Sequence, residues 1–375
     1  MGKGKGATVS VCMIVKNEES VLGRALECLD FADEIVIADT GSEDNTKEVA
    51  RRFTDKVYDF EWTDDFAAAR NFVFSKGSSN YLMWLDADDV VTKENSEKLS
   101  KWKENAEADV LYCLYDAAFD ENGTPTFSYY RERVVRNDPR ARWAGFVHEC
   151  ITPFGKSEYS DIRIEHRPPS GRKKQGRNLE IYRRHLQKGA RFNAREKFYY
   201  GRELIFNGFK EEGIAVINGM LAMPDAFYVN CIEGLRTVAE AEISLGKAEA
   251  AKLSYLKSFM FGEPRAGIVN GLGRLAMARN DYAEAAFWFR AALNCRDHSA
   301  EGDFERPEER ALIPYLQLTV CLWRQNDFEG AKRAHKAAEA IAPNHPSVAY
   351  NRQFFDYRRG KKKEVKTSIK GYVIK

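Results

Sequence analysis

The sequence predicts an α/β unit built on a mostly parallel sheet, followed by an all-α unit of helical repeats. In the first half, strand-like and helix-like segments alternate, a pattern typical of parallel sheets covered by helices. Strand signals disappear beyond about residue 178, and a helix-turn-helix pattern then recurs. At 375 residues, 44% of them hydrophobic, the chain is long enough for two or three domains.

The first half opens on apolar runs that suit buried strands, most of them followed by a segment with helical periodicity. In chain order the expected strands are 8–15, 34–39, 56–60, 81–86, 109–119 and 126–137, and the expected helices are 19–31, 47–53 and 66–76. The last two strands flank the turn DENGTP, which predicts a hairpin. The segment 165–178 contains two prolines, two glycines and several bases, as a linker or active-site loop would.

In the second half, a turn followed by small and aromatic residues recurs at Asn207, Asn280 and Asn326, with a weaker copy at Leu245. Small residues occupy matching positions at Ala285 and Ala331, and again at Ala292 and Ala338. This spacing resembles degenerate tetratricopeptide (TPR) repeats. Such repeats bury one continuous core by stacking and leave a concave face for a partner. The pattern GLGRLA at 271–276 matches a dinucleotide-binding motif, but no strand precedes it, so we expect helix packing there.

Composition excludes several classes of function. The 58 basic and 56 acidic residues leave a net charge of +2, so the total charge favours neither a nucleic-acid nor a membrane partner. The bases between Arg163 and Lys197 have little aromatic interleaving, which argues against RNA binding. Seven scattered cysteines without a C-x-x-C pair favour reduced thiols in a cytoplasmic protein. No apolar run reaches the ~18 residues of a membrane span.

Acidic residues follow two of the expected strands. Asp39 ends one strand and Asp86 another, and ligands bind beyond the carboxyl ends of strands in open α/β sheets. Asp86 and Asp88 are two apart, so in an extended chain both carboxylates would lie on one side, as suits Mg²⁺ or Mn²⁺ beside a phosphate. The same acids could form a polar turn before a helix near Thr92. Spacing alone leaves both readings open.

The loop DTGSEDNT at 39–46 has two readings as well. Gly41 permits a tight turn, and Ser42 or Asp44 can cap the next helix. A strand, a glycine-containing turn and a helix N-terminus also form a site for a nucleotide. This loop by itself does not decide between them.

Four motifs occur in order over about 90 residues: VSVCMIVKNEE, IVIADTGSEDNT, FAAARN and MWLDADD. Together they resemble the nucleotide-binding half of family 2 glycosyltransferases, which have the GT-A fold. The resemblance covers about residues 8–166. It implies a GT-A (Rossmann-like) catalytic domain over 1–165, a basic linker, active-site lid and connecting helix over 166–195, and the TPR-like domain over 196–375.

The resemblance implies contacts to a UDP-sugar. Asp39 would contact the base, the opening-strand loop the base and ribose, and the D-x-D acids the ribose and a metal. The implied donor contacts are Val15, Asn17, Glu18, Asp39, Arg70, Asn71, Asp86, Ala87 and Asp88. Arg70 could instead be a surface ion-pair partner, and Asn17 a helix cap.

The same resemblance implies a divalent metal, Mg²⁺ or Mn²⁺, held by Asp86, Asp88 and His166. His166 could also be an ordinary polar residue after a strand. Arg172, with Lys173, Lys174 and Arg177, would fold over the diphosphate as a lid, or these bases could belong to a solvated linker.

Transfer also requires a base that deprotonates the acceptor. The stretch RWAGFVHECI resembles the W-x-G-x-x-H-E segment of repeat-carrying members of the family, and it offers Glu149 for this role. The alternative is a structural acid paired with Arg142 or Arg163.

A GT-A domain followed by TPR-like helices resembles the bacterial peptide S- and O-glycosyltransferases that modify bacteriocins. We therefore expect a metal-dependent, inverting transfer from a UDP-sugar to an acceptor, for instance a cysteine or serine of a peptide or protein bound by the repeats. The alternatives are a lipopolysaccharide or cell-surface glycan acceptor, a nucleotidyltransferase, and a non-catalytic scaffold with a relict transferase domain. The repeats could instead form a homodimer.

Overall fold

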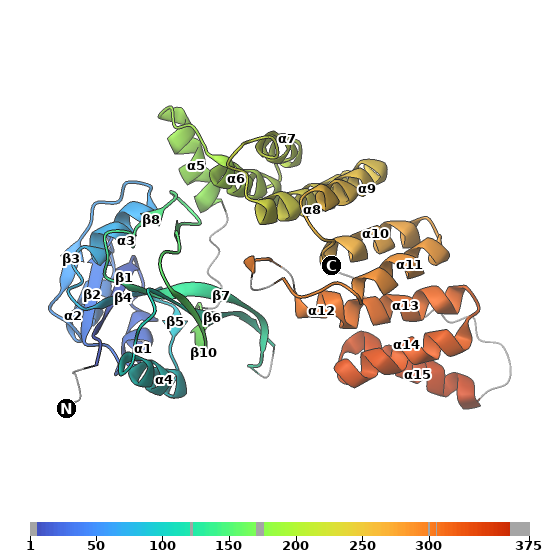
Figure 1. Cartoon of the computed structure of the whole chain (residues 1–375), viewed down its shortest axis with the longest axis horizontal. Coiled ribbons are helices and arrows are strands. Elements are labelled where there is room, and N and C mark those ends of the chain that lie inside the picture. Colours follow the sequence, from blue (N-terminus) through green and yellow to red (C-terminus); the bar gives the residue numbers. More distant parts are fainter. Residues whose placement is uncertain (1–5, 121–122, 170–175, 299–300, 305, 361–375) are drawn as a thin grey trace. The chain divides into compact units, whose positions relative to one another are not determined.

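The computed structural model describes residues 6–120, 123–169, 176–298, 301–304 and 306–360, with side chains described to residue 356. The chain divides into two compact units, Met1–Arg191 and Phe192–Lys375 (Figure 1).

Over its described residues the first unit contains an eight-stranded sheet in the order β3-β2-β1-β4-β7-β6-β10-β5. The strands are β1 (Val9–Val15), β2 (Glu34–Asp39), β3 (Val57–Asp59), β4 (Tyr81–Leu85), β5 (Asp89–Val90), β6 (Val110–Phe119), β7 (Pro125–Arg136) and β10 (Ser157–His166). Neighbours β3, β2, β1 and β4 are parallel, so their carboxyl ends meet at one edge. The β6–β7 pair is the predicted hairpin. A second small sheet pairs β8 (Trp143–Ala144) with β9 (Cys150–Ile151). The predicted α/β class is confirmed.

Both faces of the sheet are buried, which explains the continuous apolar runs of the central strands. In β1, Val11 and Met13 pack into the core beneath α1 (Leu22–Leu26) and α4 (Lys93–Lys103), whereas Cys12 packs on the opposite face. That opposite face is covered by α3 (Phe66–Phe74) and by β8. Helix α2 (Thr46–Arg51) follows β2, and α5 (Arg177–Gln187) closes the unit.

The second unit is helical throughout its described residues. Its helices are α6 (Ala194–Phe206), α7 (Lys210–Met220), α8 (Tyr228–Ser244), α9 (Ala248–Lys257), the short η1 (Ser258–Met260), α10 (Ala266–Ala278), α11 (Tyr282–Ala292), α12 (Pro307–Arg310), α13 (Leu312–Arg324), α14 (Phe328–Ile341) and α15 (Pro346–Gly360). The predicted small positions are completely buried: Ala285, Ala292, Ala331 and Ala338. Tight helix packing therefore accounts for their size.

Each of the four predicted turns joins two helices with the same backbone geometry. The second residue after the first helix has a positive φ, namely 93° at Gly208, 74° at Gly246, 62° at Asn280 and 64° at Asn326. Its N–H bonds to the carbonyl three residues before it, and the next N–H bonds to the carbonyl five residues before. This is the Schellman motif, in which glycine or asparagine is favoured because of the left-handed conformation.

The GLGRLA stretch lies inside α10, as expected. A Cβ on Gly271 would lie 2.4 Å from Tyr255, and one on Gly273 would lie 2.7 Å from Phe289. These glycines allow neighbouring aromatic rings to approach the helix backbone.

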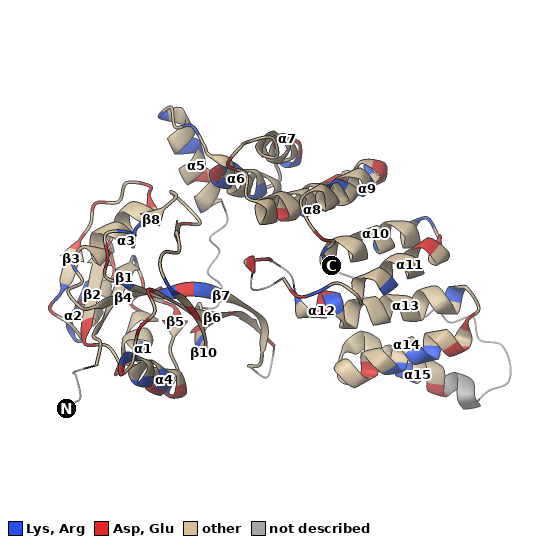
Figure 2. Cartoon of the chain, viewed as in Figure 1, with Lys and Arg blue, Asp and Glu red and all other residues tan. Residues whose placement is uncertain are grey.

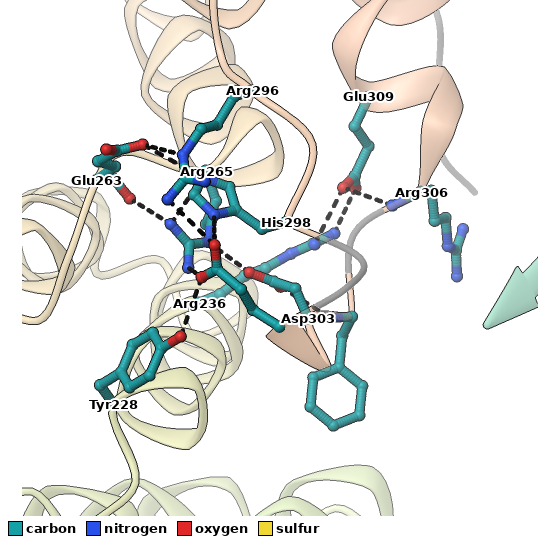
Figure 3. A network of polar contacts seen from close by, with 11 residues as sticks. Tyr228, Arg236, Glu263, Arg265, Arg296, His298, Asp303, Arg306 and Glu309 are labelled. Atoms are coloured by element: carbon teal, nitrogen blue, oxygen red, sulfur yellow. Dashed lines mark hydrogen bonds and ion pairs between the residues drawn. The ribbon is translucent and has the colours of Figure 1, made fainter. Parts of the chain in front are cut away.

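Acidic and basic residues are interspersed along the elements of both units, consistent with the small net charge (Figure 2). Within the second unit, a polar network fastens the connection between α11 and α12 to the start of α10 (Figure 3). Arg265 contacts Asp303 and lies 2.9 Å from His298 Nε2, and Tyr228 donates to Glu301 at 2.9 Å. Arg265 and His298 are buried, whereas Tyr228, Glu263 and Arg296 are exposed, so the network runs from the interior to the surface.

Candidate functional site

A cavity of about 430 Å³ lies in the first unit, at the carboxyl ends of β1 and β4. Predicted site residues that line it are Val15, Asn17, Glu18, Arg70, Asp86, Ala87, Asp88, Glu149 and His166. They come from segments far apart in the sequence, which the parallel strands and the loop before β9 bring together. Arg172 lies outside the described residues, as do Lys173 and Lys174.

Asp39 lies at the end of β2 and is buried, and it is not among the cavity-lining residues, although its neighbour Thr40 is. Its Oδ1 accepts hydrogen bonds from the backbone N–H groups of Gly41 at 3.0 Å and Ser42 at 2.9 Å. Its Oδ2 is buried without a hydrogen-bond partner among the described residues. A buried carboxylate oxygen without a partner is costly, so this atom is suited to accept a ligand N–H.

Asn17 ties the two loops at this edge together. Its backbone has φ 54°, and its side-chain oxygen accepts from the backbone of Glu43 at 2.8 Å. The Asn17 backbone N–H donates to Ser42 Oγ at 2.9 Å, and that of Glu18 donates to Thr46 Oγ1 at 2.7 Å. The loops after β1 and β2 therefore form one rigid wall.

Arg70 bridges two acids at the cavity. Its Nε donates to Glu149 Oε1 at 2.6 Å, and its Nη2 donates to Asp86 Oδ1 at 2.8 Å. Its Cζ lies 4.9 Å from the ring centres of both Trp84 and Trp143. Burial would lower the pKa of Arg70, but the Asp86 and Glu149 carboxylates outweigh burial and raise it. Glu149 thus pairs with Arg70, and not with Arg142 or Arg163, the partners weighed from sequence.

Asn71, the neighbour of Arg70, is not among the cavity-lining residues. Its side chain donates to the carbonyl of Trp143 at 3.0 Å and accepts from the Trp143 N–H at 2.9 Å. This pair of bonds fixes β8 against α3.

Asp89 is completely buried below the acidic turn. It accepts hydrogen bonds from Arg133 Nη1 at 2.9 Å, Tyr115 Oη at 3.0 Å and the backbone N–H of Asp86 at 3.1 Å. Asp89 therefore shapes the turn that carries Asp86 and Asp88.

One group of donors among the described residues is suited to a metal ion. Single ligand atoms of Asp88, Asp89 and His166 all lie within 4.8 Å of one another. Asp88 Oδ2 and His166 Nδ1 are buried without hydrogen-bond partners among the described residues. The Asp89 carboxylate, and to a lesser extent Asp88, raises the pKa of His166 despite burial. Carboxylate oxygens suit Mg²⁺ and Mn²⁺, and an imidazole nitrogen suits a transition metal, so the residues fit Mn²⁺ better than Mg²⁺. Asp86, also predicted as a ligand, is instead bound to Arg70.

Several cavity residues were not singled out from the sequence. They are Ile14, Lys16, Thr40, Trp62, Phe66, Trp84, Arg131, Val147, His148 and Asn178. Arg131 lies on β7, pairs with Glu132 at 3.3 Å and stacks 4.8 Å from the Trp84 ring. The two arginines of YYRERVV could have indicated Arg131 as a site residue, because charged residues inside an apolar strand are unusual. Arg177, predicted in the lid, also lines the cavity at the start of α5.

The loop that carries Glu149 is held in an unusual conformation by α5. Its backbone has φ 100° at Gly145 and 54° at His148. The Phe146 ring stacks on His185 of α5 at 3.6 Å, and Tyr182 of α5 donates to the Val147 carbonyl at 3.4 Å. A non-glycine residue in this conformation persists only when its surroundings hold it there, which is common at functional sites.

Residues 10–157 match the sequence model described as Glycosyl transferase family 2. The first unit is a family 2 glycosyltransferase domain. This region contains the four ordered motifs apart from Val9, and all the described cavity residues except His166, Arg177 and Asn178.

Relatives of this chain include a TPR repeat-containing protein and two glycosyltransferases. A TPR repeat-containing protein of Synechococcus elongatus is 33% identical over 147 residues, which is 39% of this chain and 36% of the relative. The SPbeta prophage-derived glycosyltransferase SunS of Bacillus subtilis is 27% identical over 224 residues, covering 56% and 53%. The lipopolysaccharide core biosynthesis glycosyltransferase LpsC of Rhizobium meliloti is 30% identical over 156 residues, covering 39% and 58%.

The chain thus spans between about a third and a half of the length of the first two relatives. The helices of the second unit extend the transferase domain with TPR-like repeats. Within the described part of the chain, no helix is long and apolar enough to cross a membrane.

Proposed function

We propose that the chain transfers a sugar from a UDP-sugar to a nucleophilic acceptor, with inversion at the anomeric carbon. The observation that carries the proposal is the grouping, in one family 2 cavity, of a metal-binding set of acids and an ordered carboxylate, Glu149. Asp39, with its unpartnered buried oxygen, would receive the nucleobase N–H.

Asp88 and His166 would hold Mg²⁺ or Mn²⁺, beside Asp89, whose oxygens already accept from Arg133, Tyr115 and the Asp86 N–H. When bound, the ion would neutralise the charge that develops on the leaving diphosphate. Arg131 and Lys16 add positive charge to the same cavity and would bind the diphosphate directly.

In the transfer step, the acceptor attacks the anomeric carbon while the bond from that carbon to the diphosphate oxygen breaks. The diphosphate leaves with the bonding electrons, and the acceptor proton passes to Glu149. Glu149 is suited to this role because it lines the cavity and its loop is rigidly held. Asp86 and Ala87 would contact the ribose from the same turn.

For the acceptor, we propose a cysteine or serine of a peptide or protein, bound by the TPR-like unit. The similarity to a TPR repeat-containing protein supports a polypeptide acceptor, because stacked repeats present a concave face to a partner. The similarity to LpsC favours a second candidate, a lipopolysaccharide-type glycan. A thiol would demand less of the base than a hydroxyl, since its pKa is near 8.5.

The test measures UDP release from a panel of UDP-sugars with Mn²⁺ or Mg²⁺, with and without cysteine peptides, serine peptides or oligosaccharides. The variants Asp86→Ala and Asp88→Ala should abolish release, whereas Asp161→Ala, an exposed acid paired with Lys98, should not change it. No release from any donor, or unchanged release in both cavity variants, would overturn the proposal.

A further inference from the structure

Arg70, Glu149 and Asp86 form an ion triad at the cavity, and the three side chains differ in their exposure to solvent. The Arg70 and Glu149 side chains are 7% and 11% exposed, whereas that of Asp86 is 37% exposed. The Arg70–Glu149 half is therefore shielded from water, where a charged hydrogen bond is strongest and most directional. Asp86 forms the open end of the triad, on the side of the acidic turn.

The protein scaffold, and not a ligand, sets the position of the Arg70 guanidinium. Two indole rings flank it, one from β4 and one from β8, each 4.9 Å away. Helix α3 is capped at its start by Asp65, which accepts from the Ala68 N–H at 2.9 Å. The paired bonds between Asn71 and Trp143 lock β8 to the same helix. With its Nε and Nη2 committed to carboxylates, the guanidinium is arranged to fix those acids in place.

The chemistry of a general base explains why such fixing matters. A carboxylate base must present one oxygen to the acceptor proton at hydrogen-bond distance. Arg70 holds Oε1 of Glu149, which leaves Oε2 to take the proton. An arginine stays protonated in proteins, so it cannot compete for that proton.

We infer that Arg70 is a positioning residue, which acts on the transfer step by orienting Glu149 and does not act by binding the nucleotide. This inference rests on the proposed function, in which Glu149 is the base. Asp86 anchors the far end of the guanidinium and so links the turn of the donor side to the base.

The decisive experiment is a double-mutant cycle on kcat, with Arg70→Lys, Glu149→Gln and the double variant. Lysine keeps the charge but cannot donate to both acids in the fork geometry. We expect Arg70→Lys to lower kcat by roughly 10- to 100-fold with the donor KM changed less than about threefold. The double variant should be no slower than Glu149→Gln alone, within about threefold, because the effect of Arg70 on kcat passes through Glu149, whereas its bond to Asp86 acts on the donor KM.

If the fold reduction in kcat of the double variant equals the product of the two single reductions, the inference is overturned. It is also overturned if Arg70→Lys raises the donor KM and leaves kcat unchanged. Arg136→Lys is the matched control, since Arg136 also pairs with an acid, Asp109, at 2.7 Å but lines no part of the cavity. It should leave both constants unchanged.

If Arg70→Lys does not fold, Arg70→Gln takes its place in the cycle, because glutamine keeps a hydrogen-bond donor but cannot hold both acids. A comparable loss of kcat supports orientation by Arg70, and full kcat overturns it. A wild-type chain that releases no UDP would overturn the proposed function itself, together with this inference.

Discussion

The guanidinium of Arg133 lies 2.9 Å from the carboxylate of Asp89, and neither side chain is exposed to solvent. The same guanidinium stacks 3.7 Å from the Trp84 ring and 4.4 Å from the Tyr115 ring. This pair forms the floor beneath the turn that carries Asp86 and Asp88. Its role is to hold that turn, because Asp89 uses both its oxygens within the protein.

Breaking this pair should strongly destabilise the first unit. Arg133→Met leaves a buried charge on Asp89, and we expect a loss of about 3–5 kcal/mol. Adding Asp89→Asn should restore part of that loss, since it removes the stranded charge. Arg140→Met breaks an exposed pair with Asp138 and should cost far less, because solvent screens that pair. Urea unfolding measures all three; equal costs for Arg133→Met and Arg140→Met would contradict the prediction.

Metal affinity should depend on His166 and Asp88. We expect Mn²⁺ to raise the melting temperature of the wild-type chain in the presence of UDP, and EDTA to reverse the rise. His166→Ala or Asp88→Asn should weaken the apparent Mn²⁺ affinity by at least about tenfold, because each removes one donor of the cluster. Asp161→Ala, remote from the cluster, serves as control. Unchanged affinity in both cavity variants would exclude this metal site.

Adding a Cβ to a turn residue with a positive φ should lower stability even where no neighbouring atom is close. Gly246 has φ 74°, and a Cβ there would meet nothing within 4 Å. Gly246→Ala should therefore cost about 1–2 kcal/mol through backbone strain alone. Gly219 of α7 also has free space but no positive φ, so Gly219→Ala should stabilise by up to about 1 kcal/mol. Neither added Cβ meets a neighbouring atom, so the two variants differ only in backbone conformation. Thermal unfolding measures both melting temperatures, and a change of the same sign in both variants would refute this account.

Stability of the helical unit should fall with rising pH because of Glu233. Burial raises the pKa of Glu233 from 4.5 to about 7, although Arg236 and Arg202 oppose the shift. Between these values the folded chain holds a proton that the unfolded chain has released, so stability is lost as the pH rises and levels off above about 7.

Glu233→Gln should remove this loss. The variant should match the wild type near pH 4.5 and exceed it at pH 8, by on the order of 1–2 kcal/mol. Exposed Glu211 provides the control, since Glu211→Gln should show no such trend. Melting temperatures between pH 4.5 and 8 measure the difference, and a pH-independent gap would count against the buried carboxyl.

Much of the fold could be predicted from local patterns. Apolar runs in β1 and β4 are continuous because both faces of the sheet are covered. The turns at Gly208 and Asn280 are predicted by glycine and asparagine, which tolerate a positive φ. The ordered motifs also predicted most of the cavity lining, because residues at the carboxyl ends of parallel strands must meet at one edge.

The partners of those residues were harder to predict. Asn71 follows Arg70 directly, but their side chains point in different directions, as neighbours on a helix do. Asn71 bonds to the backbone of β8, whereas Arg70 bridges two acids. The pairing of Glu149 with Arg70 joins residues 79 apart, and no local pattern encodes such a contact. Arg131 was missed because the cavity face of β7 depends on a register irregularity between Leu111 and Tyr112 of its partner β6.

The sequence by itself determined the α/β unit, the TPR-like repeats and the family of the transferase domain, since periodicity and ordered motifs are local properties of the chain. Tertiary structure decided how the three neighbouring acids divide their contacts. Asp86 binds Arg70, Asp88 keeps a buried oxygen without a partner, and Asp89 is paired with Arg133. The reason is physical: charges that share one turn are distinguished only by burial and by the cations that distant strands and helices place beside them.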